Sequence, residues 1–365
     1  MTGRSSASST PGSPSLEPIA TILVTGGLGF IGSAVIRRLL AKSDHKVVNL
    51  DKHSYASTEG SVESAVASAD PGRYRFFRCD LADAVAVQNV VTETSPSAVL
   101  HLAAESHVDR SIDGPRAFLD SNIVGTFNLL EAVRSHGSVQ RFVHVSTDEV
   151  FGSLGRKDPA FDEATAYDPR SPYSATKAAS DHLARAWGET YGLPVSVTNC
   201  SNNYGPYQFP EKLIPLMTIK ALRQEPLPVY GRGENIRDWL HVEDHAAALL
   251  AVLAHGEASR TYAIGGDSEV SNLEVVGQIC DLVDAASGDQ GRRSLIEFVS
   301  DRPGHDLRYG VDASRIKAEL GWAPTHSFGS GLAATVDWFL ANEDWWGPLL
   351  GESGGGARRG LQEAC

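Results

Sequence analysis

The chain has 365 residues, of which 42% are hydrophobic and 21% are charged, a composition typical of a globular protein with a sizeable core. This length predicts one large domain or two closely packed ones. The formal net charge of −13 argues against non-specific binding to nucleic acid or to an anionic membrane surface. No apolar run approaches the roughly 20 residues needed to span a bilayer, and the N-terminus lacks the features of a signal peptide. We therefore expect a cytoplasmic protein without membrane association.

Both ends of the chain are poor in residues that could form a core. Residues 1–18 are mostly Ser, Thr, Pro and Gly, and residues 351–365 have a similar character. Such segments bury too little apolar surface to offset the entropy of ordering, so we expect disordered tails. The four cysteines, which include Cys365 in the second tail, have no metal-like spacing, so we expect reduced thiols without disulfides or a bound metal.

Between the tails, short apolar runs alternate with longer amphipathic stretches, which is typical of parallel strands joined by helices. The runs that predict buried strands are residues 22–24, 47–50, 76–79, 98–102, 141–146 and 195–200. The stretches that predict helices are residues 31–40, 85–91, 115–135 and 172–191. This order predicts an α/β fold with a Rossmann-type doubly wound parallel sheet over residues 19–205.

The alternation becomes less regular after about residue 205, where glycines and prolines interrupt the chain at Gly205-Pro206, Pro226, Pro228 and Gly231-Arg232-Gly233. We interpret residues 206–350 as a smaller mixed α/β lobe that holds the substrate. Elements from about residue 235 to 265 are expected to return to the first domain.

A glycine-rich segment, Thr25-Gly26-Gly27-Leu28-Gly29-Phe30-Ile31-Gly32, lies between the first predicted strand and helix. Gly26 permits a tight turn, Gly29 lets a pyrophosphate approach the backbone, and Gly32 lets helix and strand pack closely. Surface turns also collect glycine, but the strand before and the helix after favour a dinucleotide site. Asp51 ends the second strand, where it would bind ribose hydroxyls and repel a 2′-phosphate, which favours NAD over NADP. The neighbouring Lys52 weakens that preference.

Two further strand ends are candidates for cofactor contact. Asp80-Leu81 follows the third strand, where Asp80 could accept from an adenine amino group or could cap the next helix. Small residues end the fourth strand in His101-Leu102-Ala103-Ala104-Glu105-Ser106. They would let a flat ring or a sugar lie against the backbone, or they could serve only for packing.

Two segments carry the chemistry expected of a catalytic site, Ser146-Thr147-Asp148-Glu149-Val150 and Tyr173-Ser174-Ala175-Thr176-Lys177. Tyr173 and Lys177 share one face of a predicted helix, so the ammonium can stabilise a phenolate and make Tyr173 a base near neutral pH. Asp148 and Glu149 could form a solvated turn. Beside the Tyr–Lys pair, however, they offer a separate acid and base, which simple alcohol oxidation does not need. The combination predicts elimination of water coupled to hydride transfer.

These segments resemble the dTDP-glucose 4,6-dehydratase family of the extended short-chain dehydrogenase/reductases. The resemblance spans about residues 21–350 and rests on LAAESHVDRS (102–111), STDEVFG (146–152), SPYSATKAASDHL (171–183), TNCSNNYGPYQFPEKLIPL (198–216), RDWLHVEDHA (237–246) and DRPGHD (301–306). It implies a tightly held NAD and a reaction that oxidises carbon 4 of dTDP-glucose, eliminates water across carbons 5 and 6 and returns the hydride to carbon 6. Tyr173, with Lys177 and Thr147, would remove the carbon 4 hydroxyl proton. Glu149 would be the base at carbon 5 and Asp148 the acid at carbon 6.

The motifs and the resemblance together predict two sets of binding residues. The cofactor set is Gly26, Gly29, Phe30, Ile31, Gly32, Asp51, Lys52, Ser54, Asp80, Leu81, Leu102, Ala103, Ala104, Ser106, Ser121, Ser146, Tyr173, Lys177 and Asn203. The sugar-nucleotide set is Ser106, Thr147, Asn202, Lys212, Leu213, Pro228, Val229, Tyr230, Arg237, Asn272, Arg302 and His305. Arg237 and Arg302 suit a diphosphate because a guanidinium fork matches phosphate oxygens, although an isolated Arg is more often in a surface salt bridge. The roles of His107 and Asp109 stay open.

The helices at 115–135 and 172–191 each carry an apolar stripe beyond what the sheet would cover. The family pairs such helices across a two-fold axis, so we expect a homodimer built on a four-helix bundle, unless the stripes are internal core.

Three other functions are compatible with parts of this pattern. A nucleotide-sugar epimerase or decarboxylase of the same superfamily shares the glycines, Tyr173 and Lys177 but does not require Asp148 and Glu149. A UDP-glucose dehydratase would bind a substrate whose base, uracil, lacks the one methyl group of thymine. A hydrophobic pocket discriminates such a difference by only about 1–3 kcal/mol. A catalytically silent dinucleotide-binding sensor would keep the glycines and lose the Tyr–Lys pair.

Overall fold

The structure, a computed structural model, describes residues 20–301 and 304–353. The expected N-terminal tail, Arg302 and nearly all of the expected C-terminal tail lie outside the described residues. Within them, no helix combines the length and the apolar character that crossing a membrane requires.

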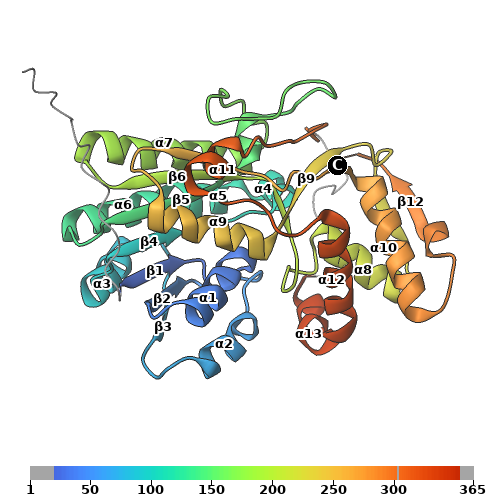
Figure 1. Ribbon diagram of the computed structural model, residues 1–365, viewed down its shortest axis with the longest axis horizontal. Coiled ribbons are helices and arrows are strands. Elements are labelled where there is room, and N and C mark those ends of the chain that lie inside the picture. Colours follow the sequence, from blue (N-terminus) through green and yellow to red (C-terminus); the bar gives the residue numbers. More distant parts are fainter. Residues whose placement is uncertain (1–19, 302–303, 354–365) are drawn as a thin grey trace, which may run out of the picture.

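Seven parallel strands form the central sheet, in the order β10-β6-β5-β4-β1-β2-β3 (Figure 1). They are β1 (Thr21–Thr25), β2 (Lys46–Asp51), β3 (Tyr74–Arg78), β4 (Ala98–His101), β5 (Arg141–Thr147), β6 (Val195–Cys200) and β10 (Thr261–Ile264). The strand order reverses between β1 and β4, so a crevice is expected there, outside the carboxyl ends of the strands. The predicted Rossmann-type doubly wound sheet is confirmed.

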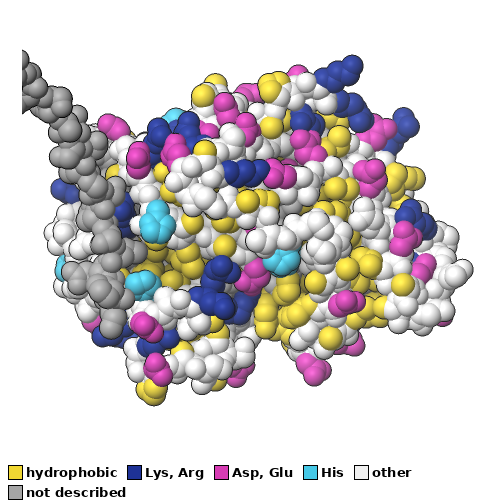
Figure 2. All heavy atoms as spheres, in the orientation of Figure 1, with side chains coloured by type: hydrophobic (Ala, Val, Ile, Leu, Met, Phe, Trp, Pro, Cys, Tyr) yellow, Lys and Arg dark blue, Asp and Glu magenta, His cyan; other side chains and the backbone are white. Residues whose placement is uncertain are grey.

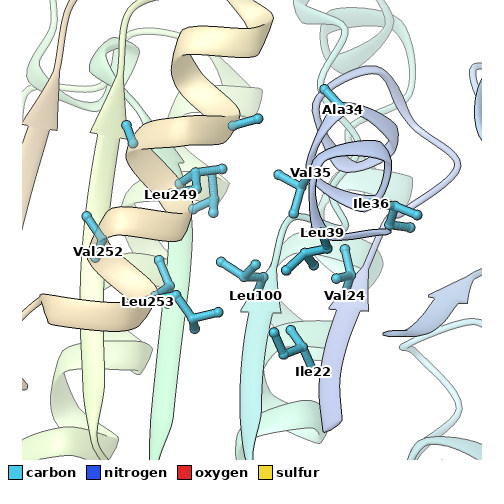
Figure 3. Packing of buried hydrophobic residues seen from close by; sticks show 14 of the residues in the cluster. Ile22, Val24, Ala34, Val35, Ile36, Leu39, Leu100, Leu249, Val252 and Leu253 are labelled. Carbon is cyan, nitrogen blue, oxygen red and sulfur yellow. The ribbon is translucent and has the colours of Figure 1, made fainter. Parts of the chain in front are cut away.

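Helices cover both faces of this sheet. One face carries α1 (Phe30–Lys42), α2 (Glu63–Ser68), α9 (Val242–His255) and α11 (Ser314–Leu320), and the other carries α3 (Ala84–Thr94), α6 (Gly125–His136) and α7 (Pro172–Tyr191). Figure 3 shows how apolar side chains from α1 and α9 meet over the strands; the labelled ones include Val35, Leu39, Leu249, Leu253, Ile22 and Leu100. This packing fixes the start of α1 against the sheet edge.

Helix α7 is defined at both ends by local sequence. Ser171 caps its N-terminus in a reciprocal capping box with Ser174, and Pro172 occupies the first helical position. Gly192 ends the helix in the left-handed conformation, with φ of 71°. The predicted range of 172–191 is therefore reproduced, because the start and stop signals both lie within the segment.

The stretch predicted as a single helix at 115–135 is interrupted. It consists of α5 (Pro115–Phe118), a π-helical turn η2 (Leu119–Val124) and α6, and it is preceded by the short α4 (Val108–Asp113), which the sequence did not predict. The side chain of Asn122 in the π-turn accepts from Glu105 N (2.9 Å) and donates to Glu105 O (3.0 Å) and Thr176 Oγ1 (3.0 Å). These partners lie far along the chain, so local periodicity does not reveal the wider turn.

A mixed α/β lobe follows, on the other side of the molecule in Figure 1. It contains α8 (Leu213–Leu222), α10 (Asn272–Ser287), α12 (Phe328–Ala341), α13 (Glu343–Ser353), and the parallel pair β8 (Leu227–Tyr230) and β12 (Ile296–Val299). A three-stranded sheet of β7 (Asn202–Tyr204), β9 (Ile236–His241) and β11 (Glu269–Ser271) lies between the two parts of the fold. Short 3₁₀ turns are η1 (Glu59–Ser61), η3 (Asp148–Phe151) and η4 (Arg292–Leu295). Figure 2 shows basic side chains scattered among acidic ones over the visible face.

Candidate active site

A cleft of about 320 Å³ lies at the carboxyl ends of the parallel strands. All five predicted catalytic residues line it: Thr147, Asp148, Glu149, Tyr173 and Lys177. Every residue of the predicted cofactor set also lines it, from Gly26 at the end of β1 to Asn203 in β7. The fold therefore brings the glycine turn and the acid–base residues into one cavity.

The glycine turn has no room for a side chain at Gly26 or at Gly32. Gly26 has φ of +71°, and a Cβ on it would lie 2.7 Å from the Cα of Ala103. A Cβ on Gly32 would lie 2.1 Å from the carbonyl oxygen of Gly26. Gly29 is the N-cap of α1 and supplies no side-chain hydrogen bond to the first turn. Backbone N–H groups at such a helix start are suited to bind a pyrophosphate.

The part of the cleft that follows β2 and β3 contains Asp51, Lys52 and Asp80. Asp51 is buried, and its carboxylate accepts from the backbone N of Leu28 (3.0 Å) and of His53 (2.7 Å). Lys52 Nζ pairs with Glu105 at 2.7 Å and donates to Ser121 Oγ at 2.9 Å. Because Glu105 neutralises it, Lys52 no longer opposes the preference for NAD over NADP.

The alternative role of Asp80 as a helix cap is wrong. The N-cap of α3 is Asp83, whose carboxylate accepts from Val85 N (3.1 Å) and Ala86 N (3.0 Å). Asp80 lies one turn earlier, accepts from Ala82 N at 2.9 Å and lines the cleft.

The two acids stand immediately after β5, in η3. Thr147 caps this turn by accepting from Glu149 N at 3.3 Å, and its hydroxyl donates to Asp148 Oδ1 at 3.3 Å. Asp148 is only 2% exposed, and its Oδ2 has no hydrogen-bond partner within the described part of the chain. Burial, followed by the charges of Glu149 and Asp238, raises the pKa of Asp148 well above its ordinary value. Asp148 is therefore a buried carboxylic acid that favours its protonated form, and the alternative of a solvated turn is excluded for it.

Tyr173 and Lys177 lie one turn apart on α7, and both are buried. Burial, followed by the charge of Glu149, raises the pKa of Tyr173 well above its ordinary value, while a hydrogen bond with Thr147 acts in the opposite direction. Lys177 Nζ donates to the carbonyl of Val145 at 2.8 Å. The role of Tyr173 as a base near neutral pH stays a prediction.

The predicted sugar-nucleotide residues divide into two groups. Ser106, Thr147, Asn202 and Lys212 line the cleft. The others that the structure describes lie outside its lining: Arg237 is in β9, and the rest are Leu213, Pro228, Val229, Tyr230, Asn272 and His305.

Three residues of this second group, Tyr230, Arg237 and His305, lie near the segment around Asp306. The rings of Tyr230 and His305 have centroids 6.0 Å apart, and His305 Nδ1 lies 2.7 Å from Asp301 Oδ1. Arg237 is buried and donates to the carbonyls of Ile236 (2.8 Å) and Asp306 (2.9 Å). The segment around Asp306 therefore connects Arg237 with His305.

Some lining residues were not predicted: Leu50, Ala56, Ser57, Cys79, Val145, Cys200, Ser201, Gln208 and Phe209. Two polar atoms in this part of the cleft, Asn202 Oδ1 and Gln208 Oε1, are buried without a hydrogen-bond partner among the described residues. Gln208 lies within the segment 198–216 that carries the resemblance, so its position after β6 and β7 was a usable signal.

Two loops and helix α4 meet beside the cleft in what we term the Glu211 cluster, formed by Tyr55, Arg110 and Glu211. The Glu211 carboxylate accepts from Tyr55 OH (3.0 Å) and from Arg110 Nη2 (3.2 Å). The Arg110 guanidinium lies 3.4 Å from the centroid of the Tyr55 ring. His107, whose role the sequence left open, caps α4 and lies 3.7 Å from Glu211.

The sheet order, the glycine turn and the buried Tyr173–Lys177 pair define a protein of the short-chain dehydrogenase/reductase class. Comparison with known proteins makes this more specific. The model of the GDP-mannose 4,6 dehydratase family matches residues 23–335, and the chain belongs to this family.

The relatives also agree with the resemblance read from the motifs. The dTDP-glucose 4,6-dehydratases of Shigella flexneri and Neisseria meningitidis serogroup B are 54% and 53% identical to the chain. The matches cover 89% and 91% of this chain and 94% and 96% of those proteins. Among solved structures, DesIV (dTDP-glucose 4,6-dehydratase) from Streptomyces venezuelae with NAD and TYD bound is 45% identical, with a TM-score of 0.84 over 90% of this chain and 99% of that one. A UDP-glucose 4-epimerase from Thermus thermophilus in complex with NAD is 30% identical, with a TM-score of 0.78, over 88% of this chain and 99% of that one.

Proposed function

We propose that the protein is an NAD-dependent nucleotide-sugar 4,6-dehydratase that converts dTDP-glucose to dTDP-4-keto-6-deoxyglucose and water. The observation that carries this proposal is the buried Asp148, whose Oδ2 has no hydrogen-bond partner among the described residues, beside Glu149 in the same cleft as Tyr173 and Lys177. An epimerase needs no such acid. The names of the relatives with about half of their residues identical support the same substrate.

The residues present fit NAD. The turn at Gly26 and Gly32 excludes any Cβ, the start of α1 offers backbone N–H groups to a pyrophosphate, and Asp51 is placed for the ribose hydroxyls. Ser106, Ser121 and Asn203 are expected nearer the nicotinamide half. When bound, NAD accepts a hydride from carbon 4 of the sugar and returns it to carbon 6.

The sugar nucleotide is expected between the two parts of the chain. We assign residues 19–205, with the elements that return from about 235 to 265, to the cofactor domain, and residues 206–350 to the sugar-nucleotide lobe. Lys212 reaches the carbonyl of Ser106 at 3.5 Å, so it links the lobe to the cleft. Arg237 supplies a guanidinium for the diphosphate, together with Arg302 from the sequence motif.

Tyr173 takes the proton of the carbon 4 hydroxyl, with Thr147 hydrogen-bonded beside it. Because its own pKa is raised, Tyr173 needs positive charge near its oxygen in order to act as a base. The ammonium of Lys177 supplies one such charge. The partial positive charge of the helix dipole at the N-terminal end of α7, where Tyr173 lies, adds to it.

Glu149 and Asp148 then carry out the elimination. A ketone at carbon 4 acidifies the neighbouring carbon 5 proton, which Glu149 removes. Asp148 gives its proton to the hydroxyl that leaves carbon 6 as water, and Glu149 returns a proton to carbon 5. The proton that Tyr173 takes from the carbon 4 hydroxyl balances the one that Asp148 gives, so one water is the only product besides the keto sugar.

The test is to incubate the purified protein with dTDP-glucose and to detect a 4-keto-6-deoxy product by its absorbance in alkali and by the loss of one water in its mass. UDP-glucose in a parallel reaction tests the base. Glu149→Gln should abolish product formation while bound NAD is still slowly reduced. Glu297→Gln, on the exposed strand β12, is the matched control and should keep full activity. Full turnover by Glu149→Gln would remove Glu149 from its role.

We also propose a homodimer through a four-helix bundle. Apolar side chains of Ile112, Leu119, Val124, Phe127 and Tyr191, on α4, η2, α6 and α7, are between 39% and 52% exposed. An apolar surface of this kind is typical of an interface. Light scattering should give twice the chain mass for the wild type and for Val85→Asp, an exposed position on α3. Phe127→Asp should shift the protein toward the monomer, and an unchanged mass would contradict this interface.

A further inference from the structure

The helix face that carries Tyr173 and Lys177 continues to a third ionisable residue, Asp181. The three are spaced by four residues on α7, which places them on one face. Asp181 is completely buried and Lys177 nearly so. Asp181 does not line the cleft, and no step proposed above uses it.

Both charged groups are fixed against the central sheet. Lys177 Nζ donates to Val145 O at 2.8 Å, and Asp181 Oδ1 lies 3.0 Å from Nε2 of the adjacent His144 in β5. Asp181 Oδ2 accepts from Tyr167 OH at 2.8 Å and from Asn199 Nδ2 at 3.3 Å. The carboxylate is thus held in one orientation by three partners.

The surrounding groups leave Asp181 as the anion that balances Lys177. Burial lowers the pKa of Lys177, and the charge of Asp181 acts most strongly against this, followed by Cys200 of β6. Burial, followed by the charge of Lys177, also lowers the pKa of His144, so His144 favours its neutral form.

The other ionisable groups that face this region do not replace Asp181. They are His101 of β4, whose pKa burial lowers, Tyr167, whose pKa burial raises, and Arg185 of α7, which donates to Tyr167 OH at 2.8 Å. None of these three is an anion under ordinary conditions. A buried ammonium without a counter-charge would tend to lose its proton.

We propose that Asp181 is a positioning residue that keeps the Lys177 ammonium charged beside Tyr173, as a buried counter-charge one helical turn away on the same face of α7. The mechanistic part of this proposal rests on the function proposed above; the pairing itself does not. Asp181→Asn keeps the shape and removes the charge. Tyr167→Phe is the matched control, because it removes one hydrogen bond to Asp181 and leaves the charge in place.

The first experiment compares the pH dependence of kcat with dTDP-glucose in the wild type, Asp181→Asn and Tyr167→Phe, using protein with its bound NAD. In parallel, the Lys177 resonance is titrated by NMR in protein labelled at lysine Cε, and it is assigned with Lys177→Met. In Asp181→Asn, the alkaline fall in kcat should occur at a pH about one unit or more below that of the wild type. The midpoint of the Lys177 titration should move down by the same amount. In Tyr167→Phe, the alkaline fall in kcat and the Lys177 titration should stay at their wild-type pH values. A folded Asp181→Asn protein with both at wild-type positions would overturn the proposal.

A second experiment covers the case in which Asp181→Asn does not fold. Urea unfolding of the wild type, both single variants and Asp181→Asn/Lys177→Met measures the coupling between the two charges. The double variant should be more stable than the sum of the two single losses predicts, and it should fold if Asp181→Asn does not. Additive losses would overturn the pairing. A wild-type protein that makes no keto sugar would overturn the proposed function, while the lysine titration and the stability cycle would still test the pairing.

Discussion

Tyr55 donates a 3.0 Å hydrogen bond to Glu211, a residue 156 positions further along the chain. Together with Arg110, these residues tie the loop after β2 and the segment after β4 to the loop before α8. The same three segments contribute Ser54, Ser106 and Lys212 to the lining of the cleft. The Glu211 cluster therefore joins three segments that line the cleft.

Glu211→Gln should accelerate the loss of bound NAD. The substitution removes the charge from two hydrogen bonds, and a hydrogen bond to a charged group contributes about 1.5–3 kcal/mol. We therefore expect a dissociation rate at least about tenfold higher, measured as NAD released after dilution into an NAD-consuming assay. Glu225→Gln, in a half-exposed pair with Lys220, should release NAD at the wild-type rate. Equal rates for both variants would show that the Glu211 cluster does not retain the cofactor.

Gly32→Ala should prevent a native glycine turn. The new Cβ would lie 2.1 Å from the backbone oxygen of Gly26, so strand and helix must separate, which we expect to reduce the free energy of unfolding by at least about 3 kcal/mol. Gly329→Ala is the control, because no atom lies within 4 Å of its Cβ and it stands in the first turn of α12. It should be neutral or stabilise by up to about 1 kcal/mol. Urea unfolding and the NAD content of purified protein measure both effects.

Asp148→Asn should separate structure from catalysis. Since burial already favours the neutral carboxylic acid, an isosteric amide preserves the charge state, and we expect a change in unfolding free energy within about 1 kcal/mol. The amide cannot give a proton to the leaving hydroxyl, so product formation should fall by about 10²–10⁴-fold. Oxidation at carbon 4 should persist, visible as the absorbance of reduced cofactor. Dehydration within a few-fold of the wild-type rate would contradict the role of Asp148 as the acid.

His245 should make the protein less stable as the pH is lowered. Its Nδ1 lies 2.8 Å from Asn203 Oδ1, and burial lowers its pKa from 6.5 to about 3. Between these values the unfolded chain binds the proton and the folded chain does not. This contribution is therefore present above pH 6.5 and is lost as the pH falls, by at most about 1.4 kcal/mol per unit.

The measurement is the slope of unfolding free energy against pH from 7.5 to about 5. In His245→Gln, the amide can still donate to Asn203. The slope should decrease by the amount that corresponds to about one bound proton, at most about 1.4 kcal/mol per pH unit. His136→Gln, at a partly exposed position on α6, should leave the slope unchanged. Identical slopes in His245→Gln and the wild type would show that another group controls this dependence.

Local patterns in the chain were sufficient for strands β1 to β6 of the sheet, for α7 and for the glycine turn, but not for β10. Buried parallel strands require continuous apolar runs, and the caps of α7, Ser171 and Gly192, lie in the segment that they end. The requirement for glycine at positions 26 and 32 likewise follows from the strand-turn-helix order. The acid pair directly follows β5 and the Tyr–Lys pair lies near the start of α7, and both line one cleft at the carboxyl ends of the strands.

Packing between distant segments decided the rest. The π-turn at Asn122 depends on Glu105 and Thr176, and the Glu211 cluster depends on three segments that are far apart along the chain. The raised pKa values of Asp148 and Tyr173 and the lowered pKa of Lys177 all have burial as their largest cause, followed by nearby charges. Residue type and spacing specify which groups are present, but the energy of a charge depends on its solvent exposure and on its neighbours in space. Only the folded chain fixes those two quantities.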